Sequence, residues 1–158
     1  MSTGAVETDP ENRELTQFLS YRIVRVHQTL NAQAVAVLDA VAGITLTQWR
    51  LIAMIGTGTA TTARDVTRRT MIDPAMISRT TKALEEAGLL STSRPDSDRR
   101  VVEMELTPRG QEIFERTLPF MRTRQQALMD ALDEDEQAII FGILDKLERA
   151  ADRRDFGQ

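Results

Sequence analysis

Apolar side chains recur every three or four positions along most of this chain, which is the spacing of one face of an α-helix. The first such stretch, residues 15–41, contains no proline, and Gly43 follows it where a helix end is expected. Its apolar positions are Leu15, Phe18, Leu19, Ile23, Val26, Leu30, Ala34, Val37 and Val41. This pattern predicts one long helix, too long for a small domain to bury its whole apolar stripe.

Two shorter helices are predicted next, each from a residue that can cap a helix start. The second helix should begin at Thr47, whose hydroxyl can accept a bond from a free amide, and should end at Gly56 and Gly58. A third helix should open at Thr62, because Asp65 three positions later completes a pattern that resembles a capping box.

The fourth helix has the clearest start and stop signals. Asp73 is a capping residue, Pro74 fits the first helical position, and Gly88 is typical of a helix end. Its predicted inner face holds Ile77, Thr81, Leu84 and Gly88, and its outer face holds Ala75, Ser78, Arg79 and Lys82. Two short helices joined by a tight turn, the second ending in glycine, indicate a helix-turn-helix.

Residues 89–94 and 101–107 have strand-like patterns, and a polar link joins them, so a β-hairpin is predicted. Thr107 and Pro108 then start another helix, which Pro119 should kink or split. Asp133 and Glu136 predict the start of a last helix, whose buried residues should be Ile140, Ile143, Leu144 and Leu147. The predicted fold is mainly α with a small β-hairpin wing, a winged helix-turn-helix with long helical extensions at both ends.

Composition removes several classes of function. The chain has no cysteine and one histidine, His27, so a disulfide framework, a thiolate metal site and a Ser-His-Asp triad have little or nothing to draw on. We therefore expect no metal, no cofactor and no enzyme activity; the carboxylates after residue 132 are explained as a helix start, where the helix dipole favours acids. The sequence has no apolar run of membrane-spanning length and no signal-like start, so a soluble cytoplasmic protein is expected.

The charge is unevenly distributed. The net charge is -4, but residues 62–82 contain five basic and two acidic residues. Since the attraction of phosphate is screened over roughly 8–10 Å, an acidic protein can still present a basic face to nucleic acid.

The outer face of the fourth helix has the residue types that read a DNA major groove. Arginine can bond guanine in bidentate fashion, serine can bond a base or a phosphate, and lysine neutralises phosphate. We assign Arg79 to base reading, Ser78 to a base or a phosphate, and Lys82 to phosphate. The alternative is that these residues form an ordinary solvated face.

The polar hairpin tip carries Arg99 and Arg100 beside Asp96 and Asp98. An arginine on a thin ribbon can enter a narrow minor groove, where the potential is most negative, and a nearby carboxylate can orient it. Exposed tips also carry such residues for solubility and turn formation, but the tip directly follows a helix-turn-helix.

Residues 49–110 resemble the MarR family of bacterial transcription regulators. The resemblance lies in Ser-Arg on the fourth helix, the LEEAGLL segment after it, and the hairpin segment DSDRRVVEMELTPRG. The hairpin is the more specific part, because the family's Asp-x-Arg pattern falls on Asp98 and Arg100, followed by Leu106, Thr107 and Gly110.

The resemblance implies a homodimer that binds palindromic double-stranded DNA and represses nearby genes until a small molecule lowers its affinity. It assigns Arg100 to the minor groove and Asp98 to orienting it. The expected domains are a disordered tail (1–11), a helical dimerisation region (12–44 and 108–155) and the DNA-binding domain (45–107). The expected DNA-binding residues are Thr62, Arg64, Ala75, Ser78, Arg79, Lys82, Asp98, Arg99 and Arg100.

The family's ligand pocket lies between the dimer helices and the DNA-binding lobe. Arg22 lies on the apolar stripe of the first helix, where its charge needs a partner. An anionic effector, such as an aromatic carboxylate, would supply one, with Ser20, Tyr21 and Trp49 as further contacts; an internal salt bridge across the dimer is the alternative. The segment around Tyr21 is similar to that of family members that respond to hydroxycinnamate-type compounds.

A ligand-responsive repressor is thus the leading hypothesis. The alternative from another class is a protein-interaction module that kept the winged scaffold without binding DNA.

Overall fold

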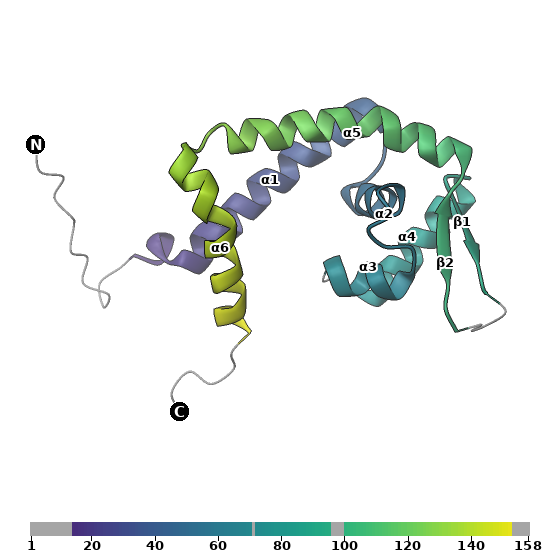
Figure 1. Cartoon of the computed structure of the whole chain (residues 1–158), viewed down its shortest axis with the longest axis horizontal. Coiled ribbons are helices and arrows are strands. Elements are labelled where there is room, and N and C mark those ends of the chain that lie inside the picture. Colours follow the sequence, from purple (N-terminus) through teal and green to yellow (C-terminus); the bar gives the residue numbers. More distant parts are fainter. Residues whose placement is uncertain (1–13, 71, 96–99, 153–158) are drawn as a thin grey trace, which may run out of the picture. The chain divides into compact units, whose positions relative to one another are not determined.

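The structure is a computed structural model that describes residues 14–70, 72–95 and 100–152 (Figure 1). The predicted disordered tail, residues 1–11, lies outside the described residues. The chain divides into two compact units, Met1–Leu118 and Pro119–Gln158. Its mainly helical composition with one two-stranded antiparallel hairpin confirms the predicted fold class.

The first predicted helix begins later than expected. Leu15–Gln17 is a short 3-10 turn (η2), Phe18 is extended with φ -64° and ψ 137°, and helix α1 spans Leu19–Ala42. Gly43 ends α1 in the left-handed conformation with φ 61°, as predicted. The prediction failed at the start because Leu15, Phe18 and Leu19 have a helical spacing, which does not exclude one extended residue between two turns.

Helix α2 spans Leu46–Gly56, and its cap is Thr45, which corrects the predicted cap at Thr47. The Thr45 hydroxyl accepts a bond from the Gln48 amide (3.2 Å), and the Gln48 side chain accepts one from the Thr45 amide (2.8 Å). This reciprocal pair is a capping box, which satisfies two amides at once. Helix α3, Ala63–Thr70, starts as predicted after Thr62, whose hydroxyl accepts a bond from the Asp65 amide (3.1 Å).

Helix α4 spans Pro74–Glu86 and has the predicted start and stop. The Asp73 carboxylate accepts bonds from the amides of Ala75 (2.9 Å) and Met76 (3.2 Å). Gly88 follows the helix with φ 67°, a conformation that side chains disfavour. The buried face consists of Ile77, Thr80, Thr81 and Leu84, which confirms the predicted inner face apart from Gly88, an exposed residue beyond the helix.

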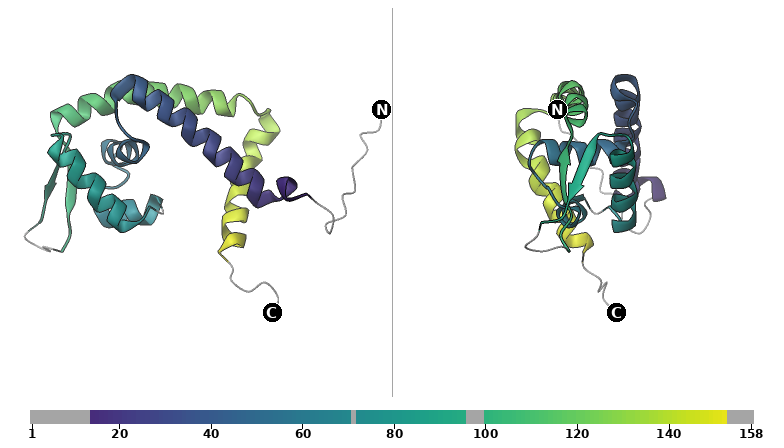
Figure 2. Two further views of the ribbon diagram at one scale, coloured as in Figure 1. Left: turned by 180° about the vertical axis from the view of Figure 1, so that it is seen from behind. Right: turned by 90° about the vertical axis from the view of Figure 1, so that its right-hand side faces the viewer.

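The hairpin strands β1, Leu90–Ser93, and β2, Glu103–Leu106, are shorter than predicted. They pair antiparallel, with Leu90 opposite Leu106 and Thr92 opposite Met104. The amide of Met104 also donates to the carbonyl of Thr61 (2.7 Å), so the loop before α3 extends the pairing at β2. Figure 2 shows the hairpin beside α4 in two views.

Helix α5 spans Pro108–Met129 and passes through Pro119 without a break, so the predicted split does not occur. At its start the Thr107 hydroxyl accepts a bond from the Gly110 amide (3.1 Å) and donates one to the Gly88 carbonyl (2.7 Å). Phe114 stacks on Trp49 of α2, with ring centroids 6.2 Å apart. These two rings belong to the core of the unit Met1–Leu118, which also contains Leu38, Leu51, Ile52, Val66, Ile77, Leu84 and Met104.

Helix α6, Glu134–Ala151, begins with the predicted capping box of Asp133 and Glu136. The predicted burial of its apolar residues is wrong for the single chain: the helix has no buried residue. Ile143 is 41% exposed and Leu144 49% exposed, whereas Ile140 and Leu147 are half-buried. Helical spacing shows which residues share a face but not what covers that face.

None of the described helices is by itself long and apolar enough to cross a membrane; α1 and α2 pass such a test only as a pair, bent by 74°.

Candidate nucleic-acid interface

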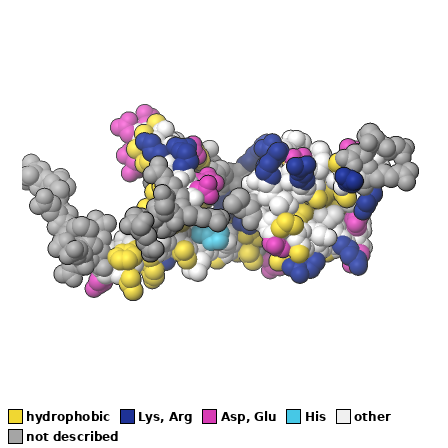
Figure 3. Space-filling model, turned by 90° about the horizontal axis from the view of Figure 1, so that it is seen from below, with side chains coloured by type: hydrophobic (Ala, Val, Ile, Leu, Met, Phe, Trp, Pro, Cys, Tyr) yellow, Lys and Arg dark blue, Asp and Glu magenta, His cyan; other side chains and the backbone are white. Residues whose placement is uncertain are grey.

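An open hollow of about 850 Å³ lies between α3, α4 and the hairpin. Its basic lining residues come from α3, from α4 and from the segment that follows β1. Its lining consists of Ala63, Arg64, Thr67, Arg68, Pro74, Ile77, Ser78, Thr81, Lys82, Glu85, Thr92, Arg94 and Val102. Figure 3 looks onto this face and shows Lys and Arg side chains spread around it.

Helix α4 presents the outer residues that the sequence predicted. Ala75, Ser78, Arg79 and Lys82 are all exposed, and Ile77 (1% exposed) and Leu84 (0%) anchor the opposite face in the core. Ser78 and Lys82 line the hollow, whereas Ala75 and Arg79 lie on the exposed helix surface outside its lining.

Helix α3 contributes two arginines to the hollow, Arg64 and Arg68. The Thr62 hydroxyl is less available for a contact with DNA than predicted, because it already makes two bonds. It donates to the Asp65 carboxylate (2.9 Å) and accepts a bond from the Asp65 amide, which caps α3. Arg68 forms a pair with Asp65 (2.8 Å), but 71% of its side chain is exposed. Exposed pairs of this kind contribute little, so a phosphate can replace the carboxylate at small cost.

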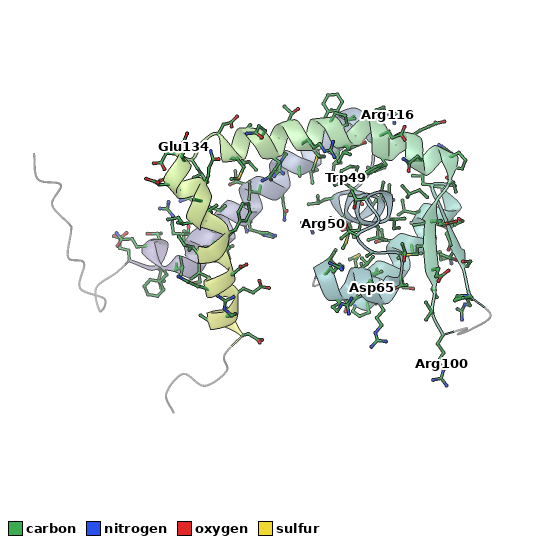
Figure 4. The ribbon with its side chains drawn as sticks, in the orientation of Figure 1. Trp49, Arg50, Asp65, Arg100, Arg116 and Glu134 are labelled. Atoms are coloured by element: carbon green, nitrogen blue, oxygen red, sulfur yellow. The ribbon has the colours of Figure 1, made fainter. Side chains whose placement is uncertain are left out.

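Arg100 extends from the end of the hairpin and is exposed (Figure 4). The other two predicted tip residues, Asp98 and Arg99, lie outside the described residues. The predicted orienting contact between Asp98 and Arg100 therefore remains a prediction.

The charge of the hollow is mostly positive. Among its described lining residues, Glu85 carries the one negative charge, and Arg64, Arg68, Lys82 and Arg94 carry positive charge. Lys82 also lies 3.8 Å from Glu86, with 78% of the lysine side chain exposed. The hollow can accept several phosphates along its edges while an outward helix face reaches bases.

Sequence reasoning did not assign three of these residues, Arg68, Glu85 and Arg94, to the interface. Arg94 follows β1, and its place in the hollow depends on the angle between the hairpin and α4, which the sequence pattern does not give. Arg68 was counted in the basic stretch but not assigned to DNA. Glu85 gave no signal, since acidic residues near a helix end usually contact water.

The predicted effector residues fall into two separate places. Ser20 and Arg22 are exposed in the first two turns of α1, and Tyr21 is 42% exposed. Trp49 is only 6% exposed and packs in the core of the lobe. Arg22 is thus exposed in the single chain, and its contact with an effector or with a partner chain stays a prediction.

Two small hollows lie near these residues. Arg22 lines one of about 240 Å³ together with Arg25, Val26, Thr29 and Leu30. Trp49 lines another of about 520 Å³ together with His27, Arg50, Ala53, Met54, Arg69 and Thr70. Each hollow contains two arginines, so each has the charge for an anionic ligand, but neither contains the full predicted set.

Polar side chains connect α1 to α2 beside the second hollow. Arg50 donates to the side-chain oxygen of Asn31 (3.3 Å), and the Asn31 amide nitrogen lies 3.0 Å from Nε2 of His27. His27 is exposed on α1.

Comparison with known proteins gives matches over the region that carries the hollow. Residues 44–102 match the MarR family. The HTH-type transcriptional regulator FarR of Neisseria gonorrhoeae is 24% identical over 130 residues, which cover 82% of this chain and 88% of FarR.

Solved structures share the fold over most of the chain. A MarR/EmrR family transcriptional regulator from Acinetobacter sp. ADP1 is similar with a TM-score of 0.81 and 25% identity, covering 90% of this chain and all of that one. MepR of S. aureus, solved in a complex with DNA, has a TM-score of 0.78 and 19% identity, over 85% of this chain and 98% of its own.

Proposed function

Because this chain belongs to the MarR family of winged helix-turn-helix transcriptional regulators, we propose that it represses transcription from a palindromic operator, from which a small anionic aromatic effector releases it. Family membership establishes a DNA-binding transcriptional regulator, not an enzyme. The palindrome, the repression and the class of effector are the proposed parts.

The observation that carries the proposal is the basic hollow beside the exposed face of α4. A helix with Ser78 and Arg79 outward can enter a major groove, where arginine discriminates guanine by two bonds. Arg64 and Arg68 of α3 and Lys82 of α4 itself line the hollow beside that face and suit the flanking phosphates. Since most of the charged side chains around the hollow are basic, this arrangement favours DNA over a protein partner without strong negative charge.

A palindromic operator has two equivalent half-sites, so two copies of the helix-turn-helix are needed to bind it. The first half of α1 and much of α6 expose large apolar residues in the single chain, such as Val26 (56%) and Phe141 (57%). Soluble proteins rarely leave large apolar surfaces uncovered, and a second copy of this chain would cover them. A dimer with two-fold symmetry then places two α4 helices one DNA turn or a multiple of it apart.

The effector is proposed to bind near α1 and α2 and to change that spacing. Arg22, with Ser20 and Tyr21, and Trp49 are the candidate contacts, and both hollows near them contain arginines. A guanidinium can hold a carboxylate by two parallel bonds, and an indole provides a flat apolar wall for a ring. In the dimer, an acidic residue of the partner near Arg22 is the competing possibility.

Selection of duplexes from a random pool, with and without aromatic carboxylic acids, tests these parts together. We expect a two-fold symmetric sequence to be enriched without the acids, and the enrichment to fall when the right acid is present. An asymmetric selected sequence would contradict the palindrome. Enrichment that no acid changes, together with unchanged Trp49 fluorescence, would contradict the proposed effector class.

A further inference from the structure

Glu85 is an acidic residue on a surface that faces a polyanion. It lies in the last turn of α4 and lines the basic hollow. Facing phosphate, an unneutralised carboxylate opposes binding, so its place here needs a reason.

The structure offers such a reason in a contact to the hairpin. The hydroxyl of Thr92 on β1 donates to Oε1 of Glu85 at 2.6 Å, which is the length of a strong bond to a charged acceptor. The bond joins α4, the helix proposed to enter the major groove, to β1, the first strand of the hairpin.

A second contact joins α4 to β2, at the residue that pairs with Thr92. Met104 is opposite Thr92 in the hairpin register, and its sulfur accepts a weak bond from the hydroxyl of Thr81 at 3.7 Å. Each strand has only four residues, and an isolated two-stranded hairpin has little stability of its own. The direction of the hairpin therefore depends on these contacts with α4 and on the bond from the Met104 amide to the Thr61 carbonyl (2.7 Å). Arg100 lies eight residues beyond Thr92 in the sequence.

We propose that Glu85 is a positioning residue that, through Thr92, fixes the angle of the wing to α4, so that Arg100 reaches the minor groove while Ser78 and Arg79 occupy the major groove. This inference rests on the proposed roles of Arg79 and Arg100. In this role the Glu85 carboxylate acts as a hydrogen-bond acceptor toward Thr92, and its negative charge toward DNA is a tolerated cost.

Four substitutions separate the bond from the charge. Glu85→Ala removes both, and Thr92→Val removes the donor but keeps the charge and the side-chain shape. Glu85→Gln keeps an acceptor oxygen without the charge, and Thr92→Ser keeps the donor. Glu86→Ala is the matched control, because Glu86 is the neighbouring acid and its described ion pair is with Lys82 on the same helix.

The measurement is the affinity for the selected duplex and for a scrambled one, with thermal unfolding followed by circular dichroism to confirm the fold. We expect Glu85→Ala and Thr92→Val each to weaken binding to the selected duplex by about tenfold, roughly the contribution of one bond to a charged group. Adding Arg100→Ala to either should then cost much less than Arg100→Ala costs in the wild type. Thr92→Ser should bind nearly as the wild type. Glu85→Gln and Glu86→Ala each lose one negative charge and should bind as tightly as the wild type or slightly more tightly.

Different results identify different failures. If Glu85→Gln strengthens binding to both duplexes alike and Thr92→Val changes nothing, Glu85 acts through charge repulsion and the positioning role is wrong. Additive losses from Thr92→Val and Arg100→Ala would also overturn it. A wild type that does not prefer the selected duplex would instead contradict the proposed function itself.

Discussion

Gly110 sets how closely α5 approaches the start of the hairpin. A Cβ at this position would lie well inside contact distance of the Leu89 carbonyl oxygen, which is backbone and cannot turn away. We expect Gly110→Ala to lower the free energy of unfolding by about 1–3 kcal/mol, the usual cost of overpacking. Gly142→Ala in α6 is the control, since nothing lies within 4 Å of its added Cβ, and it should be neutral or slightly stabilising. Urea unfolding of both variants measures the difference; equal effects would contradict the close approach.

Arg79 and Arg100 are predicted to contribute to binding in different ways. Arg79→Ala should relax base preference at one position of each half-site, a loss of about 1–3 kcal/mol of discrimination, because a bidentate bond to guanine is lost. Arg100→Ala should weaken binding to most sequences alike, because the minor groove carries little base information. Competition titrations with single-base variants of the selected duplex distinguish the two. Equal small losses from both variants would contradict these roles.

At the scale of elements, helix caps are the contacts that can be tested one at a time. Thr45→Ala should lower the free energy of unfolding by about 1 kcal/mol, because the Gln48 amide loses the hydroxyl that accepts its bond at the start of α2. Thr47→Ala removes a hydroxyl that makes no described capping bond and should have a much smaller effect. Thermal unfolding measures both, and the reverse order would support the cap at Thr47 that the sequence suggested.

The residue that caps a helix start was predictable from sequence wherever only one nearby residue could act as the cap. Asp73 before a proline, and Asp133 with Glu136 after it, have few competitors nearby, and both predictions were confirmed. The start of α2 has two threonines two positions apart, and the choice depends on which of them Gln48 can reach. That depends on the backbone angles of Thr45, which composition does not reveal.

Contacts between elements were much less predictable. The outward face of α4 follows from helical spacing, so Ser78 and Lys82 were found, whereas the bond from Thr92 to Glu85 depends on the angle between helix and hairpin. Arg94 enters the hollow for the same reason. Such angles come from packing in the core, not from the local pattern.

At the scale of the whole molecule, the apolar residues that the single chain leaves exposed predict a dimer. Ile139 and Leu144 on α6 and Val24 and Val26 on α1 are all 49% exposed or more. The mass in solution, measured by sedimentation equilibrium, should be twice the 17.8 kDa of one chain. Replacing Ile139 and Leu144 together by glutamate should shift it toward one chain, whereas Lys146→Glu on the same helix should not. A wild-type mass of one chain at micromolar concentration would contradict the prediction.

The central claim is that the basic hollow and α4 bind one double-stranded sequence in preference to others. The most direct measurement is the affinity of the wild type for the selected duplex and for a scrambled duplex of equal length, at several salt concentrations. We predict at least about a thousandfold preference for the selected duplex, and log affinity that falls linearly with log salt by about 0.9 per phosphate contacted. Equal affinity for the two duplexes, or affinity that does not depend on salt, would contradict the claim.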